Sequence, residues 1–302
     1  MLHSAPFGQV LEHVTQELSG FMRDRDDGQS AEAAGGGVRT AVGAGRPRGG
    51  AVWQETRAGS LSVYVKRHTS VGPFERELRA LRQMPDRLAP RVVEHYAQPP
   101  TLVLEDVPGV RLGDSAAGKA TQWLDTAVET VVASVGLPGP WPEDPPPELD
   151  ELQVGFAAAL AAKVPASVRA LRSTLHDPLR IPCHGDISPS NMLVDAGPPV
   201  RVRLLDYEFY GPGDPLADIA ALCLTPSVDI PAAIRLAALR RGRALVEEKT
   251  GLSLADRMAG AITLWAVQCA AWHRRHRGTF RFEQAVLDHA RMGIDASVGE
   301  DL

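Results

Sequence analysis

Three polar residues set between short apolar runs form the densest chemical pattern in this 302-residue sequence. The run Cys183–Val194 carries Asp186 and, five residues later, Asn191, and a second apolar run leads to Asp206. A turn at Ala196–Pro199 predicts that the two runs form a hairpin, which returns Asp206 to the side of Asn191. Carboxylate and amide oxygens in this order are typical of a site that holds a divalent cation and handles a proton.

Phosphoryl transfer explains this spacing. The acceptor hydroxyl must be oriented and lose its proton, which one carboxylate can accept, while the triphosphate needs Mg²⁺ held by other oxygen ligands. We therefore predict that Asp186 is the catalytic base and that Asn191 and Asp206 are Mg²⁺ ligands. Glu208 follows Asp206 by two residues on an extended segment, so both side chains point to the same side. It is a candidate for binding the metal or the acceptor, with indirect support of the metal ligands as the alternative.

The segment from Cys183 to Glu208 resembles the catalytic and metal-binding segments of the aminoglycoside phosphotransferase family and of the related choline and ethanolamine kinases. Gly185 stands where protein kinases carry Arg, and Asp206-Tyr207-Glu208 stands where they carry Asp-Phe-Gly, which disfavours a protein kinase. The resemblance implies transfer of a γ-phosphoryl group to a hydroxyl of a small molecule, with ATP or GTP as donor and Mg²⁺ as cofactor. It also implies a two-lobed, protein-kinase-like fold.

Counterparts of the family's nucleotide-binding residues precede this segment. Lys66, in the strand-like run Leu61–Arg67, resembles the family lysine that reaches the α- and β-phosphates. Glu77 resembles the helix glutamate that pairs with that lysine, and it is preferred to Glu75 because the family register places Leu78 on the buried side. On their own, this lysine and glutamate would be read as solvated surface charges.

The remaining family matches use main chain or structural residues. At the inter-lobe hinge, Glu105 and Val107 would offer their main chains to the base, although a plain strand end is the alternative. Gly49 and Gly50 lie where a phosphate-covering loop belongs, but the pattern Gly-x-Gly-x-x-Gly is absent and a flexible linker is an equal alternative. Residues with a structural role are His184, a packed residue that organises the catalytic loop, and Asp218, which resembles a buried Asp that braces this loop through backbone hydrogen bonds.

The elements that must position these residues change character along the chain. Hairpin-like strands and one helix, residues 74–84, occupy the first part, and helical patterns dominate after Pro108-Gly109. We therefore predict an α+β fold with a β-rich nucleotide-binding lobe (1–104), a hinge (105–110) and a helical lobe (111–302) that carries the catalytic loops and the acceptor site. Further helices are expected at 1–23, 121–134, 148–164, 231–248, 254–276 and 282–294.

Composition sets limits on the partners. The apolar fraction of 44% and the net charge of −5 fit a globular protein and disfavour a nucleic-acid partner. No signal peptide or membrane span is recognised, and three widely spaced cysteines suggest neither a zinc site nor a disulfide framework. We expect a cytoplasmic protein whose partners are a nucleoside triphosphate and a small hydroxyl-bearing molecule.

The sequence constrains the identity of the acceptor least. An antibiotic or similar hydroxyl-rich natural product is the first choice, which would make the chain a resistance kinase. A choline-, ethanolamine- or thiamine-type kinase is the alternative, since Trp265 and Trp272 share one helical face, although aromatics at this spacing more often lie in the core. A catalytically inactive nucleotide-binding module is a third hypothesis. The proline-rich run 136–147 is a candidate acceptor lid.

Overall fold

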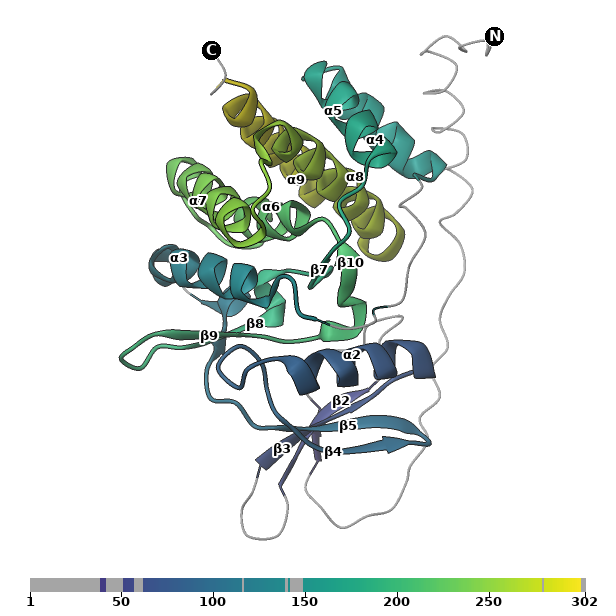
Figure 1. The fold of residues 1–302 in the computed structure, drawn as a ribbon, viewed down its shortest axis with the longest axis vertical. Coiled ribbons are helices and arrows are strands. Elements are labelled where there is room, and N and C mark those ends of the chain that lie inside the picture. Colours follow the sequence, from purple (N-terminus) through teal and green to yellow (C-terminus); the bar gives the residue numbers. More distant parts are fainter. Residues whose placement is uncertain are drawn as a thin grey trace. The chain divides into compact units, whose positions relative to one another are not determined.

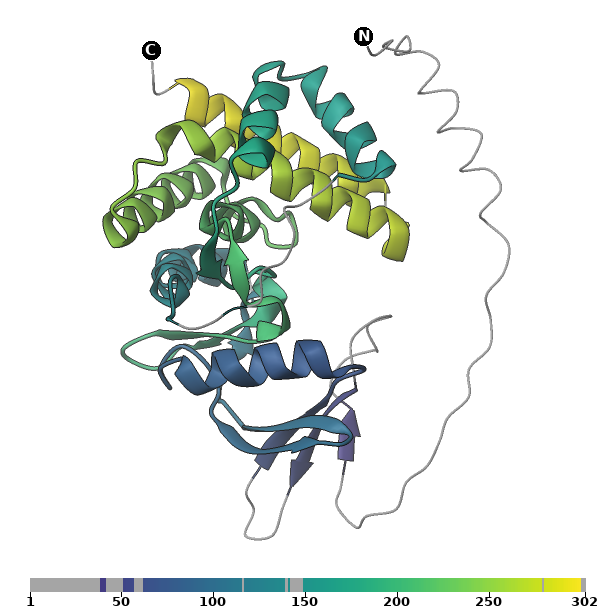
Figure 2. The same ribbon diagram turned by 45° about the vertical axis from the view of Figure 1, so that its right-hand side comes forward.

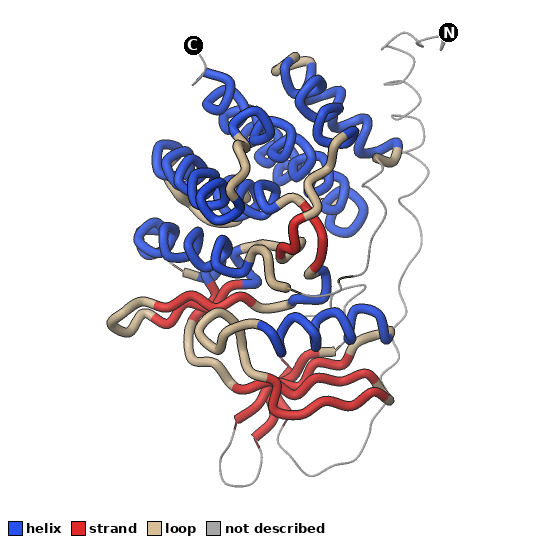
Figure 3. Tube along the Cα trace, in the orientation of Figure 1, coloured by secondary structure: helices blue, strands red, loops and turns tan. Residues whose placement is uncertain are grey.

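The computed structural model describes residues 39–41, 51–56, 62–115, 117–138, 141, 149–278 and 280–299. These residues belong to one compact unit, Val38–Leu302, while a separate unit, Met1–Gly37, lies outside the described residues. The described residues do not include the helix expected over residues 1–23 or most of the proline-rich run 136–147. The predicted α+β, two-lobed kinase-like fold is confirmed: one sheet region is followed by a larger helical region (Figures 1 and 3).

The smaller lobe is an antiparallel five-stranded sheet with the order β1-β2-β3-β5-β4. Its strands are β1 (Arg39–Ala41), β2 (Val52–Thr56), β3 (Ser62–Arg67), β4 (Val92–Ala97) and β5 (Pro100–Glu105). Side chains alternate between the two faces of a strand. On one face of β3, Val63 and Val65 pack with Val103 and Trp53 in a small apolar cluster. The next residue, Lys66, consequently lies on the opposite face.

That opposite face packs against helix α2 (Val71–Gln83), which runs across the sheet in Figure 1. Phe74, Glu77, Leu78 and Leu81 are buried at the spacing of one helical face, and the helix ends before Pro85. The helix predicted over residues 74–84 is confirmed, with a start three residues earlier. Glu77 is thereby the one acidic residue on the buried side of this helix.

The larger lobe is built from packed helices. Its helices are α3 (Ala117–Ser134), α4 (Glu151–Ala161), α5 (Ala166–His176), α6 (Pro215–Leu224), α7 (Ala232–Thr250), α8 (Met258–Arg277) and α9 (Phe280–Val298). Residues 258–267 of α8 are all buried, and this helix packs against α5, α6 and α9 (Figure 2). Helix α5 was not predicted, because the expected helix over residues 148–164 stopped short of Pro165. None of the helices in the described ranges combines the length and apolar character needed to cross a bilayer.

Short strands inside the helical lobe carry the catalytic pattern. They are β6 (Val110–Arg111), β7 (Ile181–Cys183), β8 (Met192–Asp195), β9 (Arg201–Leu204) and β10 (Gly211–Gly213). The predicted hairpin is confirmed, since β8 and β9 pair antiparallel with Met192 opposite Leu204. β7 pairs with β10 and β6 joins β8, so two small sheets hold the segments around Asp186 and Asp206.

Candidate functional site

A buried ion pair links β3 to α2. The Lys66 Nζ lies 2.6 Å from Glu77 Oε2, and the side chains of the two residues are 10% and 1% exposed. The alternation of β3 sends Lys66 to the face covered by α2, where Glu77 is the buried acid. Glu77, and not Glu75, is therefore the residue placed at this lysine.

The same ammonium group reaches across to the helical lobe. Lys66 Nζ lies 2.6 Å from Asp206 Oδ1 and 3.3 Å from Glu208 Oε2. Burial favours the neutral amine, but the charges of Glu77, Asp206 and Glu208 outweigh it and raise the pKa of Lys66 above its usual value. One ammonium group thus binds three carboxylates, two of which follow β9.

Asp206 occupies an unusual backbone conformation at the end of β9. Its φ and ψ of 68° and 62° place it in the left-handed region, which residues other than glycine seldom adopt. This turn starts the short helix η3 (Tyr207–Phe209). The Tyr207 N–H donates a hydrogen bond to Glu77 Oε1 at 3.3 Å. Backbone strain of this kind persists where surrounding contacts fix it, and it is concentrated at functional sites.

His68 joins this cluster, although no motif in the sequence marks it as a site residue. Its Nε2 lies 3.0 Å from Glu77 Oε2, without the alignment of a hydrogen bond, and its Nδ1 lies 3.7 Å from Glu208 Oε2. His68 is buried and also packs edge-on against Phe74. Its position two residues after Lys66 on an extended run was the available signal, because alternate residues share a side.

The loop predicted to be catalytic places Asp186 beside Asn191. The Asn191 Nδ2 donates to the Asp186 carbonyl oxygen at 2.9 Å and to Asp186 Oδ2 at 3.0 Å. The Leu205 N–H donates to the Asn191 carbonyl at 2.8 Å, which ties the residue before Asp206 to the loop. The hairpin therefore brings the three predicted polar residues to one place, as their spacing suggested.

His184 occupies the centre of this loop as a neutral ring. Its Nε2 donates to the Leu205 carbonyl at 2.9 Å, and its Nδ1 accepts from the Asp186 N–H at 3.3 Å. A carbonyl cannot donate and an amide N–H cannot accept, so these two contacts require the tautomer with its proton on Nε2. Burial lowers the pKa of His184 to about 4.

Asp218 lies beneath the same loop, near the start of α6. Its carboxylate accepts from the His184 N–H at 2.9 Å and from the Gly185 N–H at 3.1 and 3.2 Å. Burial raises the pKa of Asp218 to about 7, and the two backbone N–H groups oppose that shift. These are the backbone contacts expected of a bracing residue. Asp214 caps α6 by accepting from the Leu216 N–H at 2.9 Å.

Gly185 fits a position that no other residue could occupy without strain. Its φ is +78°, and a Cβ atom there would lie 2.8 Å from the carbonyl oxygen of Phe209. The main chain of the catalytic loop thus approaches the main chain of η3 closely. This geometry gives a physical reason for Gly in place of the Arg of protein kinases.

The predicted hinge residues follow β5 directly. Glu105 is the last residue of β5, and its side chain pairs with Arg91 at 2.8 Å. Val107 is buried, and its N–H makes no hydrogen bond to another described residue. Gly49 and Gly50 lie outside the described residues.

The donor set at the loop fits a hard divalent cation. Asn191 and Asp206 supply an amide oxygen and a carboxylate, and Glu208 supplies a second carboxylate close to Asp206 through their shared contact with Lys66. Oxygen ligands with few nitrogen or sulfur donors suit Mg²⁺. His68, Glu77 and Glu208 also lie within 4.8 Å of one another, but Lys66 Nζ already binds both carboxylates of that group.

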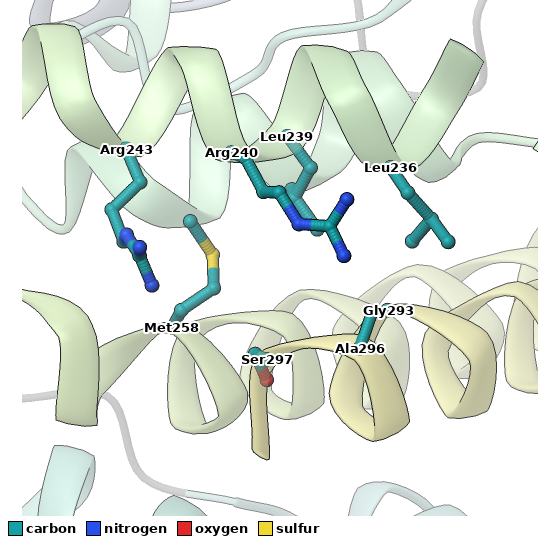
Figure 4. Close-up of a pocket in the computed structure, with 8 residues that line it drawn as sticks. All are labelled: Leu236, Leu239, Arg240, Arg243, Met258, Gly293, Ala296 and Ser297. Atoms are coloured by element: carbon teal, nitrogen blue, oxygen red, sulfur yellow. The ribbon is translucent and has the colours of Figure 1, made fainter. Parts of the chain in front are cut away.

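A separate hollow lies between the helices of the larger lobe (Figure 4). It is lined by Leu236, Leu239, Arg240, Arg243, Met258, Gly293, Ala296 and Ser297. All of these residues come from α7, α8 and α9, and none belongs to the carboxylate cluster or the catalytic loop. The hollow therefore has no part in the site described above.

Comparison with known proteins identifies the family and the fold. Residues 50–251, more than half of the chain, match the model of the phosphotransferase enzyme family, designated APH. No curated protein sequence matches the chain.

Solved structures share the fold at low sequence identity. A thermostable mutant of aminoglycoside phosphotransferase APH(4)-Ia, in complex with ADP and hygromycin B, is 14% identical with a TM-score of 0.57; the match covers 86% of this chain and 94% of that one. Choline kinase LicA from Streptococcus pneumoniae is 16% identical with a TM-score of 0.53, covering 94% and 98%. A fructosamine-3-kinase homologue from Thermobifida fusca is 18% identical with a TM-score of 0.51, covering 86% and 94%.

Proposed function

The chain belongs to the phosphotransferase enzyme family, and from this premise we propose that it transfers the γ-phosphoryl group of ATP or GTP to a hydroxyl of a small molecule. The acceptor we propose is an antibiotic or a similar hydroxyl-rich natural product, so that the reaction would confer resistance. The solved relative of similar fold that is bound to ADP and hygromycin B supports both parts of the proposal. The domain boundaries at residues 104 and 110, and the site roles below, are part of the same proposal.

One observation carries the proposal: the ammonium group of Lys66, from the sheet lobe, contacts the carboxylates of Asp206 and Glu208 in the helical lobe. Lys66 Nζ lies within 2.6 Å of both Glu77 and Asp206, and these residues come from three different elements. Asn191 joins Asp186 to the same segment. A catalytically inactive module would not require Asp186 and Asn191 in this arrangement as well as the lysine.

The residues divide the chemistry between positioning and proton transfer. Lys66, fixed by Glu77, would bind the α- and β-phosphates of the donor, and the main chains of Glu105 and Val107 would hold the base. The Asp186 carboxylate would accept the proton of the acceptor hydroxyl as its oxygen forms a bond to the γ-phosphorus. The bond from that phosphorus to the leaving oxygen breaks in line, and a nucleoside diphosphate departs.

Asn191 and Asp206 would hold Mg²⁺, with Glu208 as a further candidate. When bound, the ion neutralises the charge of the phosphates. Asp206 and Glu208 are bound by Lys66 in this structure, so the lysine keeps both carboxylates in place. His184 and Asp218 would act through the main chain of the loop and keep Asp186 in position.

The test is release of nucleoside diphosphate with Mg²⁺, with ATP and GTP assayed separately against antibiotics, choline, ethanolamine and thiamine. The variant Asp186→Asn keeps the shape of the side chain and removes the base, so acceptor-dependent kcat should fall by about 10²- to 10⁴-fold. The binding constant for the nucleotide and the melting temperature should stay close to those of the parent. Asp256→Asn, at an exposed position of the short 3₁₀ helix Ala255–Arg257 that precedes α8, is the matched control.

Two outcomes would contradict the proposal. Turnover that survives Asp186→Asn would remove Asp186 from the role of base. Nucleotide binding with no phosphorylated acceptor in the whole panel would favour the inactive module.

A further inference from the structure

His68 lies in the short connection between β3 and α2, and the site roles above leave it without a function. Its main-chain N–H donates to the Pro100 carbonyl at 2.9 Å, and its ring packs edge-on against Phe74 with the centroids 5.9 Å apart. The side chain is 1% exposed. Contacts from the sheet and from α2 therefore hold the imidazole in one place, next to the carboxylates that Lys66 binds.

His68 and Lys66 approach the same two carboxylate oxygen atoms. Glu77 Oε2 lies 2.6 Å from Lys66 Nζ and 3.0 Å from His68 Nε2. Glu208 Oε2 lies 3.3 Å from Lys66 Nζ and 3.7 Å from His68 Nδ1. The imidazole is thus a second polar group within reach of the acids that surround the lysine.

The Nε2 atom of His68 is buried and makes no hydrogen bond to another residue in the described ranges. Buried polar atoms in folded proteins nearly always have a partner, so this atom needs an explanation. Its distance of 3.0 Å from Glu77 Oε2 is that of a hydrogen bond, and only the alignment is wrong. A small rotation of the Glu77 carboxylate would complete the bond.

The lysine has a reason to need such a partner. Its ammonium group has three N–H donors, and in this structure it contacts three carboxylates, those of Glu77, Asp206 and Glu208. To bind the α- and β-phosphates of a nucleotide, Lys66 must turn at least one donor toward phosphate oxygen. The buried Glu77 carboxylate, which also accepts from the Tyr207 N–H, would then be held less firmly unless another donor replaced the lost contact.

We propose that His68 is a positioning residue for nucleotide binding: its Nε2–H donates to Glu77 Oε2 and keeps this carboxylate fixed while Lys66 turns toward the phosphates. The inference rests on the proposed function, because it names a residue that prepares Lys66 for the phosphoryl donor. The same bond gives the buried Nε2 atom its partner. Since the ring is already fixed by the sheet and by α2, little order is lost when the bond forms.

Calorimetric titration of the full-length protein tests this role. The ligands are ADP and GDP, each with Mg²⁺, and adenosine and guanosine, which have no phosphate. His68→Ala removes the ring, whereas His68→Gln and His68→Asn form a matched pair: the amide nitrogen of glutamine reaches about as far as Nε2 and that of asparagine about as far as Nδ1. The control is His289→Ala, which removes a histidine of α9 that donates to the Leu224 carbonyl at 2.8 Å.

We expect His68→Ala to raise the dissociation constant of the nucleoside diphosphate about tenfold, the effect of losing one hydrogen bond to a charged group. His68→Gln should stay within about threefold of the parent, and His68→Asn should resemble His68→Ala. The dissociation constants of the nucleosides should be the same in the parent and the His68 variants, because no phosphate contacts Lys66. His289→Ala should leave every dissociation constant unchanged, even if its melting temperature falls.

Each other outcome has a defined meaning. Unchanged diphosphate binding in His68→Ala would overturn the inference, and so would an equal loss of nucleoside binding, which would indicate a general structural role. Rescue by His68→Asn and not by His68→Gln would overturn the assignment of Nε2 as the donor. A parent protein that binds neither diphosphate would overturn the proposed function together with the inference, so the parent alone distinguishes the two failures.

Discussion

Acidification should weaken the fold through one buried imidazole. The contacts of His184 fit a neutral ring, because its Nε2–H donates a hydrogen bond to the Leu205 carbonyl and its Nδ1 accepts one from the Asp186 N–H. A second proton, on Nδ1, would point at that N–H and break the contact. The ring is fully buried and packs at a tilt against the Tyr207 ring, so water cannot solvate the added charge.

The size of the effect follows from the pKa of His184, which is about 4 in the folded chain against an ordinary value of 6.5. As pH falls through 6.5 the unfolded chain takes up the proton first, so it binds more protons than the folded chain between pH 6.5 and 4. The free energy of unfolding therefore decreases as pH falls across this window. Between pH 7.5 and 5 the linkage relation gives a loss of about 2 kcal/mol from this one residue.

Urea denaturation of the parent and of His184→Gln at pH 7.5 and pH 5 measures this loss. The glutamine amide can still donate to Leu205 and does not titrate, so the variant should be less stable at pH 7.5 but should lose about 2 kcal/mol less on acidification. Other groups titrate equally in both proteins and cancel in the comparison. Equal losses in parent and variant would refute the assignment of a neutral, buried His184.

Two further substitutions test the backbone and the charge cluster. Gly185→Ala should destabilise the fold by about 1–3 kcal/mol in thermal or urea unfolding, because φ is +78° and the new Cβ would lie 2.8 Å from the Phe209 carbonyl oxygen. The control is Gly211→Ala, which should have little effect because a Cβ there meets nothing within 4 Å. Lys66→Met should lower the free energy of unfolding by about 3 kcal/mol at pH 7 by leaving the buried Glu77 without its cation. That loss should shrink at pH 5 as the carboxylate protonates, and it should be largely restored in the double variant with Glu77→Gln; a single variant as stable as the parent would contradict the ion-pair argument.

The features of this molecule that could be predicted from the sequence are those fixed by residues close together in the chain. The hairpin of β8 and β9 follows from two apolar runs around a turn, and α2 follows from Phe74, Leu78 and Leu81 at helical spacing. The choice of Glu77 over Glu75 used the register of that helix together with the family resemblance. In each case the neighbours that decide the structure are within about a dozen residues.

Features that depend on distant segments were not accessible in this way. Asp206 contacts Lys66, 140 residues earlier in the chain, and nothing in a single sequence fixes that pair without a family resemblance. His68 has no motif of its own and gains its meaning from Glu77 and Glu208 around it. The exposure of Trp272 was likewise not predictable, because the spacing from Trp265 is the same whether Trp272 is covered by the core or exposed, as it is here.

The catalytic loop is fastened mainly through its main chain, and this has a consequence for how the enzyme can diversify. Asp218 holds the N–H groups of His184 and Gly185, and the Leu205 N–H holds the Asn191 carbonyl. Apart from the Asp218 carboxylate, these bonds do not depend on which side chains surround the loop. We therefore expect substitutions at neighbouring positions that make none of these bonds to change what the loop faces while its main chain keeps its place.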